Sequence, residues 1–308
     1  MPKTFSRRHF ITFTGTALAT AGALATPSFA VEPFRRAGKP RLRLSLAAYS
    51  FRQYFKDTTE KENKIPAEKR IDLFQFIDYC AEQGCQGAEL TSYYFPAKLT
   101  DEFMLKVKRH AFLRGVELSG TAVGNTFTVG DAERRAKEVA SVKKWIDQAA
   151  LMDMPHIRVF AGNLERQSEE AARKNCIGAL EECCEYAGSR GVFLGLENHG
   201  GIVAEPSQIL GIIKAVQSPW LGINLDTGNF HTADPYGDLA RCAPYAVNVQ
   251  VKTEMKPKDR KAEQTDLKRI IQILRDANYQ GYVALEYEAA EDPYTAVPRA
   301  LGELAALL

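Results

Sequence analysis

Short apolar runs and longer amphipathic stretches alternate eight times along this chain of 308 residues. The stretches between the runs repeat apolar residues at the spacing of an α-helix, and several end in glycine, at Gly84, Gly115, Gly191 and Gly281. The sequence therefore predicts eight successive strand and helix units. The predicted strands are rich in Val, Ile, Leu and aromatic residues and cover 41–50, 85–91, 116–123, 156–162, 192–198, 221–229, 246–252 and 281–288.

Strict alternation requires parallel strands, because each helix returns the chain to the same end of the sheet. Eight units between residues 41 and 308 match a closed barrel. The alternative is an open doubly wound sheet, which usually has a glycine-rich phosphate loop after its first strand, and no such motif follows residues 42–50. We therefore predict an α/β fold, a (β/α)₈ TIM barrel, as one catalytic domain over residues 41–308.

The first thirty residues have the features of a twin-arginine export signal. Arg7 and Arg8 precede a moderately apolar run, and Ser28-Phe29-Ala30 provides small residues for cleavage. A retained membrane anchor is the alternative, which the weak hydrophobicity of the run disfavours. We expect residues 1–30 to be a removed signal peptide and 31–40 a linker, and the mature protein to be periplasmic or secreted, without stable membrane insertion.

The charge of the chain argues against a nucleic-acid partner. The formal net charge is +2, but Lys3, Arg7 and Arg8 lie in the first thirty residues, which carry no acid, so the remainder has a net charge of −1. Binding to nucleic acids or anionic membranes relies on an excess of basic residues. We expect a small molecule as the partner, with homo-oligomerisation left open.

Six cysteines are an even number, which in an exported protein raises the question of disulfides. They lie inside apolar-periodic segments and lack the CxxC spacing of zinc sites. We therefore expect buried thiols.

In such barrels the functional residues follow the strand ends, at the C-terminal face. Glu197 and Glu286 follow apolar runs expected to be buried, and Asp226 ends the sixth predicted strand. In the seventh, VNVQVK (247–252), Gln250 and Lys252 lie on one side of the strand, because side chains alternate. Three carboxylates and an amide are thus expected at one rim.

Several carboxylates packed in a low-dielectric barrel mouth require cations or protons to compensate their repulsion. A divalent metal ion provides this compensation. Because the donors Glu197, Asp226, Gln250 and Glu286 are all oxygen ligands, Mn²⁺ or Mg²⁺ is expected rather than zinc.

Four motifs carry a resemblance to a known family: LENHGG (196–201), LDTGNFHTADPY (225–236), VQVK (249–252) and ALEYE (284–288). In this order they resemble the sugar phosphate isomerase/epimerase family, the xylose isomerase-like TIM barrels. That resemblance implies one metal ion held from the fifth to the eighth strands, which places Glu197, Asp226, Gln250 and Glu286 as ligands. The third position departs from the family, where His is commonest. Asn229 departs too, since ketose epimerases often have His there.

The resemblance also implies that Glu197 and Glu286 act as the acid/base pair. A carboxylate removes a proton beside a carbonyl, and a second carboxylate returns it to the opposite face through an enediolate. Candidates for contact with the substrate are Lys252, His199, Asn229, Glu89 and Arg158. A loop histidine without a role, and a buried Arg-Glu pair that braces the barrel, explain His199, Glu89 and Arg158 equally well.

We expect a metal-dependent isomerase, epimerase or related lyase that acts on a neutral sugar or keto-sugar, including 3-keto-glycosides. An exported enzyme rarely meets sugar phosphates, and no basic cluster follows the strand ends. The alternative is a non-catalytic periplasmic carbohydrate-binding barrel. An endonuclease with this barrel is disfavoured by the near-neutral charge and the few histidines. The charged segment 51–70 is open to two roles, a lid or an interface.

Overall fold

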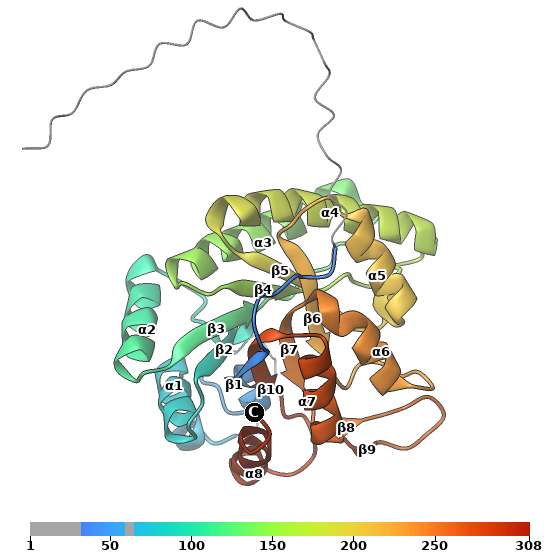
Figure 1. Cartoon of the computed structure of the whole chain (residues 1–308). Coiled ribbons are helices and arrows are strands. Elements are labelled where there is room, and N and C mark those ends of the chain that lie inside the picture. The colour runs from blue at the N-terminus through green and yellow to red at the C-terminus, as the bar shows by residue number, and fades with distance from the viewer. Residues whose placement is uncertain (1–31, 59–64) are drawn as a thin grey trace, which may run out of the picture.

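Eight parallel strands close into a barrel in the computed structural model of the chain, which describes residues 32–58 and 65–308. Helices alternate with the strands and surround them as an outer ring (Figure 1). The predicted TIM barrel is therefore confirmed. The barrel strands are β1 (Arg41–Ala47), β2 (Gly87–Thr91), β3 (Glu117–Ala122), β4 (His156–Val159), β5 (Phe193–Glu197), β6 (Leu221–Asp226), β7 (Ala246–Val251) and β10 (Gln280–Leu285).

The helices of the outer ring begin at side-chain caps where the sequence offers an acceptor. The side chains of Asp72, Thr100, Asp131 and Ser168 accept hydrogen bonds from backbone amides in the first turns of α1 to α4. The ring comprises α1 (Leu73–Glu82), α2 (Asp101–Leu113), α3 (Ala132–Leu151), α4 (Glu169–Arg190), α5 (Pro206–Ala215), α6 (Pro235–Cys242), α7 (Leu267–Asp276) and α8 (Pro293–Ala305). A small antiparallel pair, β8 (Glu254–Met255) and β9 (Glu263–Gln264), was not predicted.

Three of the four glycines predicted to end helices do so. Gly84, Gly115 and Gly191 have φ angles of 74°, 69° and 72°, the left-handed region that glycine adopts freely. The prediction for Gly281 is wrong, because this residue lies inside β10 and Asn278, with φ 51°, takes the left-handed position after α7. Gly281 is needed for another reason: a Cβ atom there would lie 2.5 Å from the Tyr279 hydroxyl oxygen.

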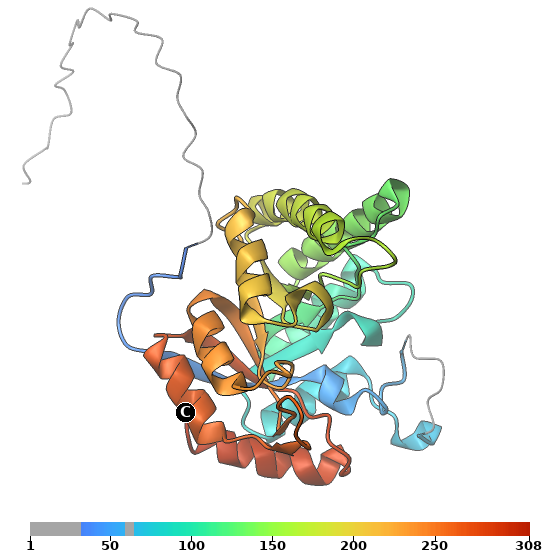
Figure 2. The same ribbon diagram turned by 90° about the vertical axis from the view of Figure 1, so that its right-hand side faces the viewer.

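Residues 32–40, expected to be a linker, are fixed to the N-terminal end of the barrel. The backbone amide of Phe34 donates to the carbonyl of Pro244 at 3.0 Å, and its ring packs edge-on against Phe193. Arg36 donates to the carbonyl of Ala246 at 2.5 Å. The dark blue segment in Figures 1 and 2 accordingly runs along this end of the barrel before it enters β1. The expected signal peptide, residues 1–30, lies outside the described residues.

The start of the charged segment 51–70 is part of the core. Phe51 and Phe55 are fully buried, and Phe55 stacks on Tyr94 with ring centroids 4.2 Å apart. A β-bridge joins Phe55 to Ile71. Of the rest of this segment the structure describes residues 56–58 and 65–70.

All six cysteines are buried and free, as predicted. They are Cys80, Cys85, Cys176, Cys183, Cys184 and Cys242. None of the helices in 32–58 and 65–308 is long and apolar enough to cross a membrane.

The barrel interior has little room at Gly120 on β3. A Cβ atom at this position would overlap the ring of His156, which packs across it from β4. We expect Gly120→Ala to lower the free energy of unfolding by about 1–3 kcal/mol, because the overpacked ring must move. Urea denaturation checks this value. The matched control is Gly178→Ala in α4, where nothing lies within 4 Å, and a gain of about 0.5–1 kcal/mol is expected. Equal effects of the two substitutions would contradict this reading of the interior.

Candidate active site

The predicted site residues gather at the C-terminal ends of β4 to β7 and β10. We define the rim cluster as Arg158, Glu197, Asp226, Lys252, Glu286 and Glu288, of which all but Glu288 are buried. Neighbouring strands set their positions: Asp226 pairs in register with Gln250 on β7, and Glu286 follows directly after β10. The structure thus brings the three predicted carboxylates to one rim.

Lys252 is the central cation of the rim cluster. Its ammonium lies 2.8 Å from Glu286 Oε2 and 3.3 Å from Asp226 Oδ2, and it also contacts Glu288. These carboxylates raise the pKa of Lys252 well above its ordinary value, against the effect of burial, so the ammonium stays charged.

Arg158 forms an ion pair with Glu197, the rim carboxylate that Lys252 does not contact. Its Nε lies 2.9 Å from Glu197 Oε2, while its Nη1 donates to the carbonyl of Val123 at 2.9 Å. The guanidinium also stacks on the Phe160 ring, 3.9 Å from the centroid. Asn229 donates to the other oxygen, Glu197 Oε1, at 2.9 Å. Both oxygens of Glu197 are therefore engaged.

His199 lies beside this pair. Its ring packs against Phe160 with centroids 4.7 Å apart, and burial and the positive charge of Arg158 lower its pKa. The imidazole is therefore neutral at pH 7, and it can accept a proton or share a hydrogen bond with a ligand.

The backbone around Asp226 is fixed by side chains of the neighbouring loops. Asn198 accepts from the Asp226 amide and donates to its carbonyl, each at 2.9 Å, so it extends the pairing of β5 with β6. Thr227 accepts from the Lys252 amide at 2.9 Å. These contacts hold the carboxylate and the ammonium at adjacent strand ends.

A second polar layer lies deeper in the barrel. We define the inner polar cluster as Glu89, His156, Asn224, Asn248 and Gln250, all buried. Four of its side chains form a closed hydrogen-bonded ring, in which Gln250 and Asn248 donate to Glu89 at 2.5 and 2.6 Å, Asn248 donates to Asn224 at 2.8 Å, and Asn224 donates to Gln250 at 2.6 Å. Burial opposes ionisation of Glu89, but His156 and the two amides outweigh it, and the pKa of Glu89 is lowered.

This ring determines how Gln250 lies. Because its amide nitrogen faces the Glu89 carboxylate, its carbonyl oxygen accepts from Asn224. The side chain does lie among buried residues of the barrel, and both ends of its amide are engaged there, the nitrogen by Glu89 and the oxygen by Asn224. Metal ligation by Gln250 stays a prediction, and the hydrogen bond from Asn224 occupies one of the two lone pairs of its carbonyl oxygen.

Burial and mutual repulsion make the rim carboxylates weak acids. The pKa of Glu197 is raised to about 7, that of Asp226 to about 6 and that of Glu286 to about 7, mainly by burial and then by neighbouring carboxylates. Arg158 and Lys252 oppose these shifts. When every group is ionised, the four carboxylates exceed the two cations by two charges.

The rim cluster fits a divalent cation in charge and donor type. Asp226 Oδ2 is buried and has the ion pair with Lys252 but no hydrogen bond, and the excess of two negative charges in the fully ionised cluster matches one such ion. In the described part of the chain, however, no three His, Cys, Asp or Glu side chains already lie close enough together to coordinate one ion. Lys252 and Arg158 instead occupy the space between the carboxylates.

Several residues of the site were not predicted. Glu288 contacts Lys252, and its signal was the alternation in ALEYE, which places it on the same side as Glu286. Asn224 and Asn248 each lie two residues before a predicted site residue, so the same alternation directs them into the barrel. His156 likewise precedes Arg158 by two residues.

The raised pKa values predict how stability depends on pH. A carboxyl group with a higher pKa in the folded state than in the unfolded state binds its proton more tightly when folded. The contribution of these three groups to stability is therefore fully present below the unfolded pKa, about 4, and is lost as the pH rises through 6 to 7. Without divalent cations, we expect the free energy of unfolding to fall between pH 5 and pH 8, as measured by urea denaturation.

Glu286→Gln removes one of the titrating groups. The fall in the free energy of unfolding between pH 5 and pH 8 should therefore be shallower in this variant than in the wild type. Glu181→Gln, at an exposed position on α4, is the matched control and should keep the wild-type slope. A wild-type slope in Glu286→Gln would show that Glu286 does not titrate in this range.

Comparisons with known proteins agree with this architecture. A crystal structure of a xylose isomerase domain protein from Planctomyces limnophilus has a TM-score of 0.65 and 15% identity, covering 88% of this chain and 98% of that one. The apo structure of YcjR from E. coli, a 3-keto-D-glucoside 4-epimerase, has a TM-score of 0.65 and 18% identity, over 87% and 100%. D-psicose 3-epimerase in the presence of D-fructose has a TM-score of 0.65 and 17% identity, over 81% and 86%.

At these identities the similarity to solved structures establishes the fold alone. No curated protein sequence gives a significant match. The sequence model of one family, described as xylose isomerase-like TIM barrel, matches residues 77–307, which is most of the chain. This protein therefore belongs to the xylose isomerase-like TIM barrel family.

Proposed function

We propose that this protein is a sugar isomerase or epimerase that moves a proton beside a carbonyl group through an enediolate. The observation that carries the proposal is the rim cluster, in which three buried carboxylates, Glu197, Asp226 and Glu286, surround two fixed cations at the C-terminal end of the barrel. Structural neighbours with the same fold include proteins named as epimerases of sugars and of a keto-glucoside, which supports this class of reaction.

Glu197 and Glu286 are suited to exchange a proton near neutral pH. Both have pKa values raised to about 7, where a carboxyl group changes charge most readily. One carboxylate takes the proton from the carbon beside the carbonyl, and the electron pair of the broken C–H bond moves to the carbonyl oxygen. Return of a proton to the opposite face by the other carboxyl group gives an epimer. Return to the neighbouring carbon, with transfer of the hydroxyl proton from that carbon's oxygen to the former carbonyl oxygen, gives an isomer.

Lys252 and Arg158 provide positive charge for the oxygen that becomes negative. Both are buried and charged, so their interaction with an enediolate oxygen is stronger than in water. Their fixed contacts with Asp226, Glu286 and Glu197 orient them before the substrate binds.

Asp226, Glu197 and Glu286 are also the residues that would hold a divalent cation, Mn²⁺ or Mg²⁺, with Gln250 as the predicted neutral ligand. Such an ion, when bound, supplies a Lewis acid that polarises the carbonyl group of the substrate. With such an ion at these carboxylates, Glu288 would remain as the partner of the Lys252 ammonium.

Solvent exchange tests the reaction. In D₂O with Mn²⁺, we expect the purified protein to incorporate deuterium at the carbon beside the carbonyl of at least one member of a panel of ketoses and 3-keto-glycosides, as measured by NMR and mass spectrometry. Glu286→Gln should lower the exchange rate by about 10²–10⁴-fold, because it removes an acid/base group. Chelation of divalent cations should also lower the rate.

Glu181→Gln on α4 is the matched control for the exchange assay and should keep the wild-type rate. Absence of exchange with every member of the panel, together with sugar binding that needs no metal and tolerates Glu286→Gln, would instead identify a carbohydrate-binding barrel without catalysis.

We also propose that the protein is exported by the twin-arginine route and acts in the periplasm or outside the cell. The support is the sequence of residues 1–30, with Arg7 and Arg8 before an apolar run. Arg7→Lys with Arg8→Lys should keep the full-length chain in the cytoplasm, while the wild type appears outside it with residues 1–30 removed. Fractionation and intact-mass measurement check this, with the exposed Arg109→Lys as a control. Retention of an unprocessed wild-type chain in the cytoplasm would contradict export.

A further inference from the structure

A pocket of about 450 Å³ opens beside the rim cluster, between the chain that follows β1 and the chain that follows β10. Its volume is within the range of small-molecule sites. Glu288 lines it and also lines a second pocket, of about 230 Å³, which includes Lys252 and Asn229. Glu288 and Ala289 line both pockets, and Glu288 also contacts Lys252, so Glu288 joins the large pocket to the rim cluster.

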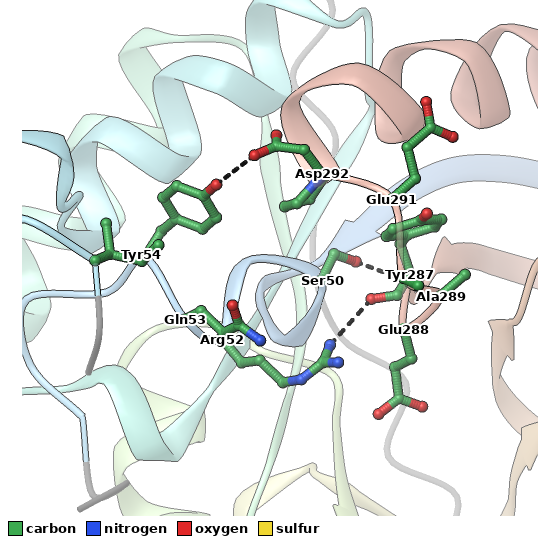
Figure 3. A pocket seen from close by; sticks show the side chains of 12 residues that line it. Ser50, Arg52, Gln53, Tyr54, Tyr287, Glu288, Ala289, Glu291 and Asp292 are labelled. Carbon is green, nitrogen blue, oxygen red and sulfur yellow. Dashed lines mark hydrogen bonds between the residues drawn. The ribbon is translucent and has the colours of Figure 1, made fainter. Parts of the chain in front are cut away.

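The walls of the large pocket are tied together before any ligand binds. Ser50 accepts from the amide of Tyr287 at 2.9 Å, and the Tyr54 hydroxyl donates to Asp292 at 2.6 Å (Figure 3). Arg52 reaches the carbonyl of Tyr287 at 3.3 Å. These three contacts join the two loops, so a ligand meets a preformed site and little ordering opposes its binding.

Arg52 and Glu288, a donor and an acceptor that line this pocket, can each form further hydrogen bonds with a ligand. The hydrogen bonds of Arg52 in the described residues use only Nη1, and its guanidinium also lies over the Tyr49 ring, which leaves the N–H groups of Nη2 and Nε for a ligand. Glu288 uses Oε2 for Lys252, and Oε1 has no protein partner in the described chain. The other two acids are already engaged, Glu291 with Arg299 and Asp292 with Tyr54.

The combination of the Arg52 guanidinium and the Glu288 carboxylate indicates the class of ligand. A sugar hydroxyl both donates and accepts, so it can bridge a guanidinium and a carboxylate. A phosphate or a second carboxylate would be repelled by Glu288, Glu291 and Asp292, which line the pocket together with a single arginine. A neutral polyhydroxylated group therefore suits the site better than an anion.

We propose that the large pocket binds the non-reacting sugar ring of a glycoside substrate, while the reacting ring lies at the rim cluster. This inference rests on the proposed function and specifies its substrate class: a glycoside of two joined rings. Glu288 lies where the two rings meet, and Arg52 is a specificity-determining residue that contacts only the non-reacting ring.

The test compares binding of glucose with binding of the disaccharides maltose, cellobiose and trehalose, by calorimetry with Mn²⁺ present. We expect at least one disaccharide to bind about tenfold more tightly than glucose, since hydrogen bonds to a charged group contribute about that much. Arg52→Ala should reduce the ratio of the two affinities toward one. Arg109→Ala, an exposed arginine on α2, should keep the wild-type ratio, and thermal melting confirms that both variants fold.

Equal affinities for glucose and all three disaccharides would overturn the proposal, and so would a lack of binding of every disaccharide or an Arg52→Ala variant that keeps the wild-type ratio. The deuterium exchange assay separates this failure from failure of the proposed function. Exchange with a free ketose, without a disaccharide preference, would leave the reaction class standing and remove only the subsite. A disaccharide preference without any exchange would leave the subsite standing and contradict the proposed reaction.

Discussion

The burial of carboxylates beside fixed cations is the constraint on which the site depends. Glu197, Asp226 and Glu286 lie in a low-dielectric barrel mouth, where each raises the energy of the others. Lys252 and Arg158 offset part of that cost, since each lies within 3 Å of a carboxylate oxygen. The compensation is incomplete, and the remaining negative charge favours the protonated forms of Glu197 and Glu286, whose pKa values are raised to about 7.

The inner polar cluster, deeper in the barrel, forms a second hydrogen-bonded layer next to the rim cluster. The inner polar cluster satisfies the buried Glu89 with the amides of Gln250 and Asn248, so a charge can exist there with its pKa lowered. Gln250 links the two layers, because the residue opposite it on β6 is Asp226. A polar interior of this kind is costly unless its members have partners. Each of the four side chains in the closed ring has at least one, and Asn248 Oδ1 is the ring atom left without a hydrogen-bond partner.

Much of the fold and of the rim cluster could be predicted from the periodic spacing of apolar residues in the sequence. The eight strands and the rim positions of Glu197, Asp226 and Glu286 follow from apolar runs that end in a polar residue. Gly281 was misassigned, because a glycine at the end of a helical pattern and a glycine required by a close neighbour look the same in one dimension. The short pair β8 and β9 was missed, since two-residue strands carry no period.

The sequence by itself determined the barrel, its order of strands and the set of polar residues at its C-terminal end, because alternation and strand direction are local properties of the chain. Only the tertiary structure decided which of these residues meet. Lys252 lies among three carboxylates from β6 and the chain after β10, and Gln250 bonds to Glu89, a residue 161 positions away, on β2. Such partners depend on how the barrel closes and on which way each side chain turns. Those are properties of packing, which no spacing along the chain records.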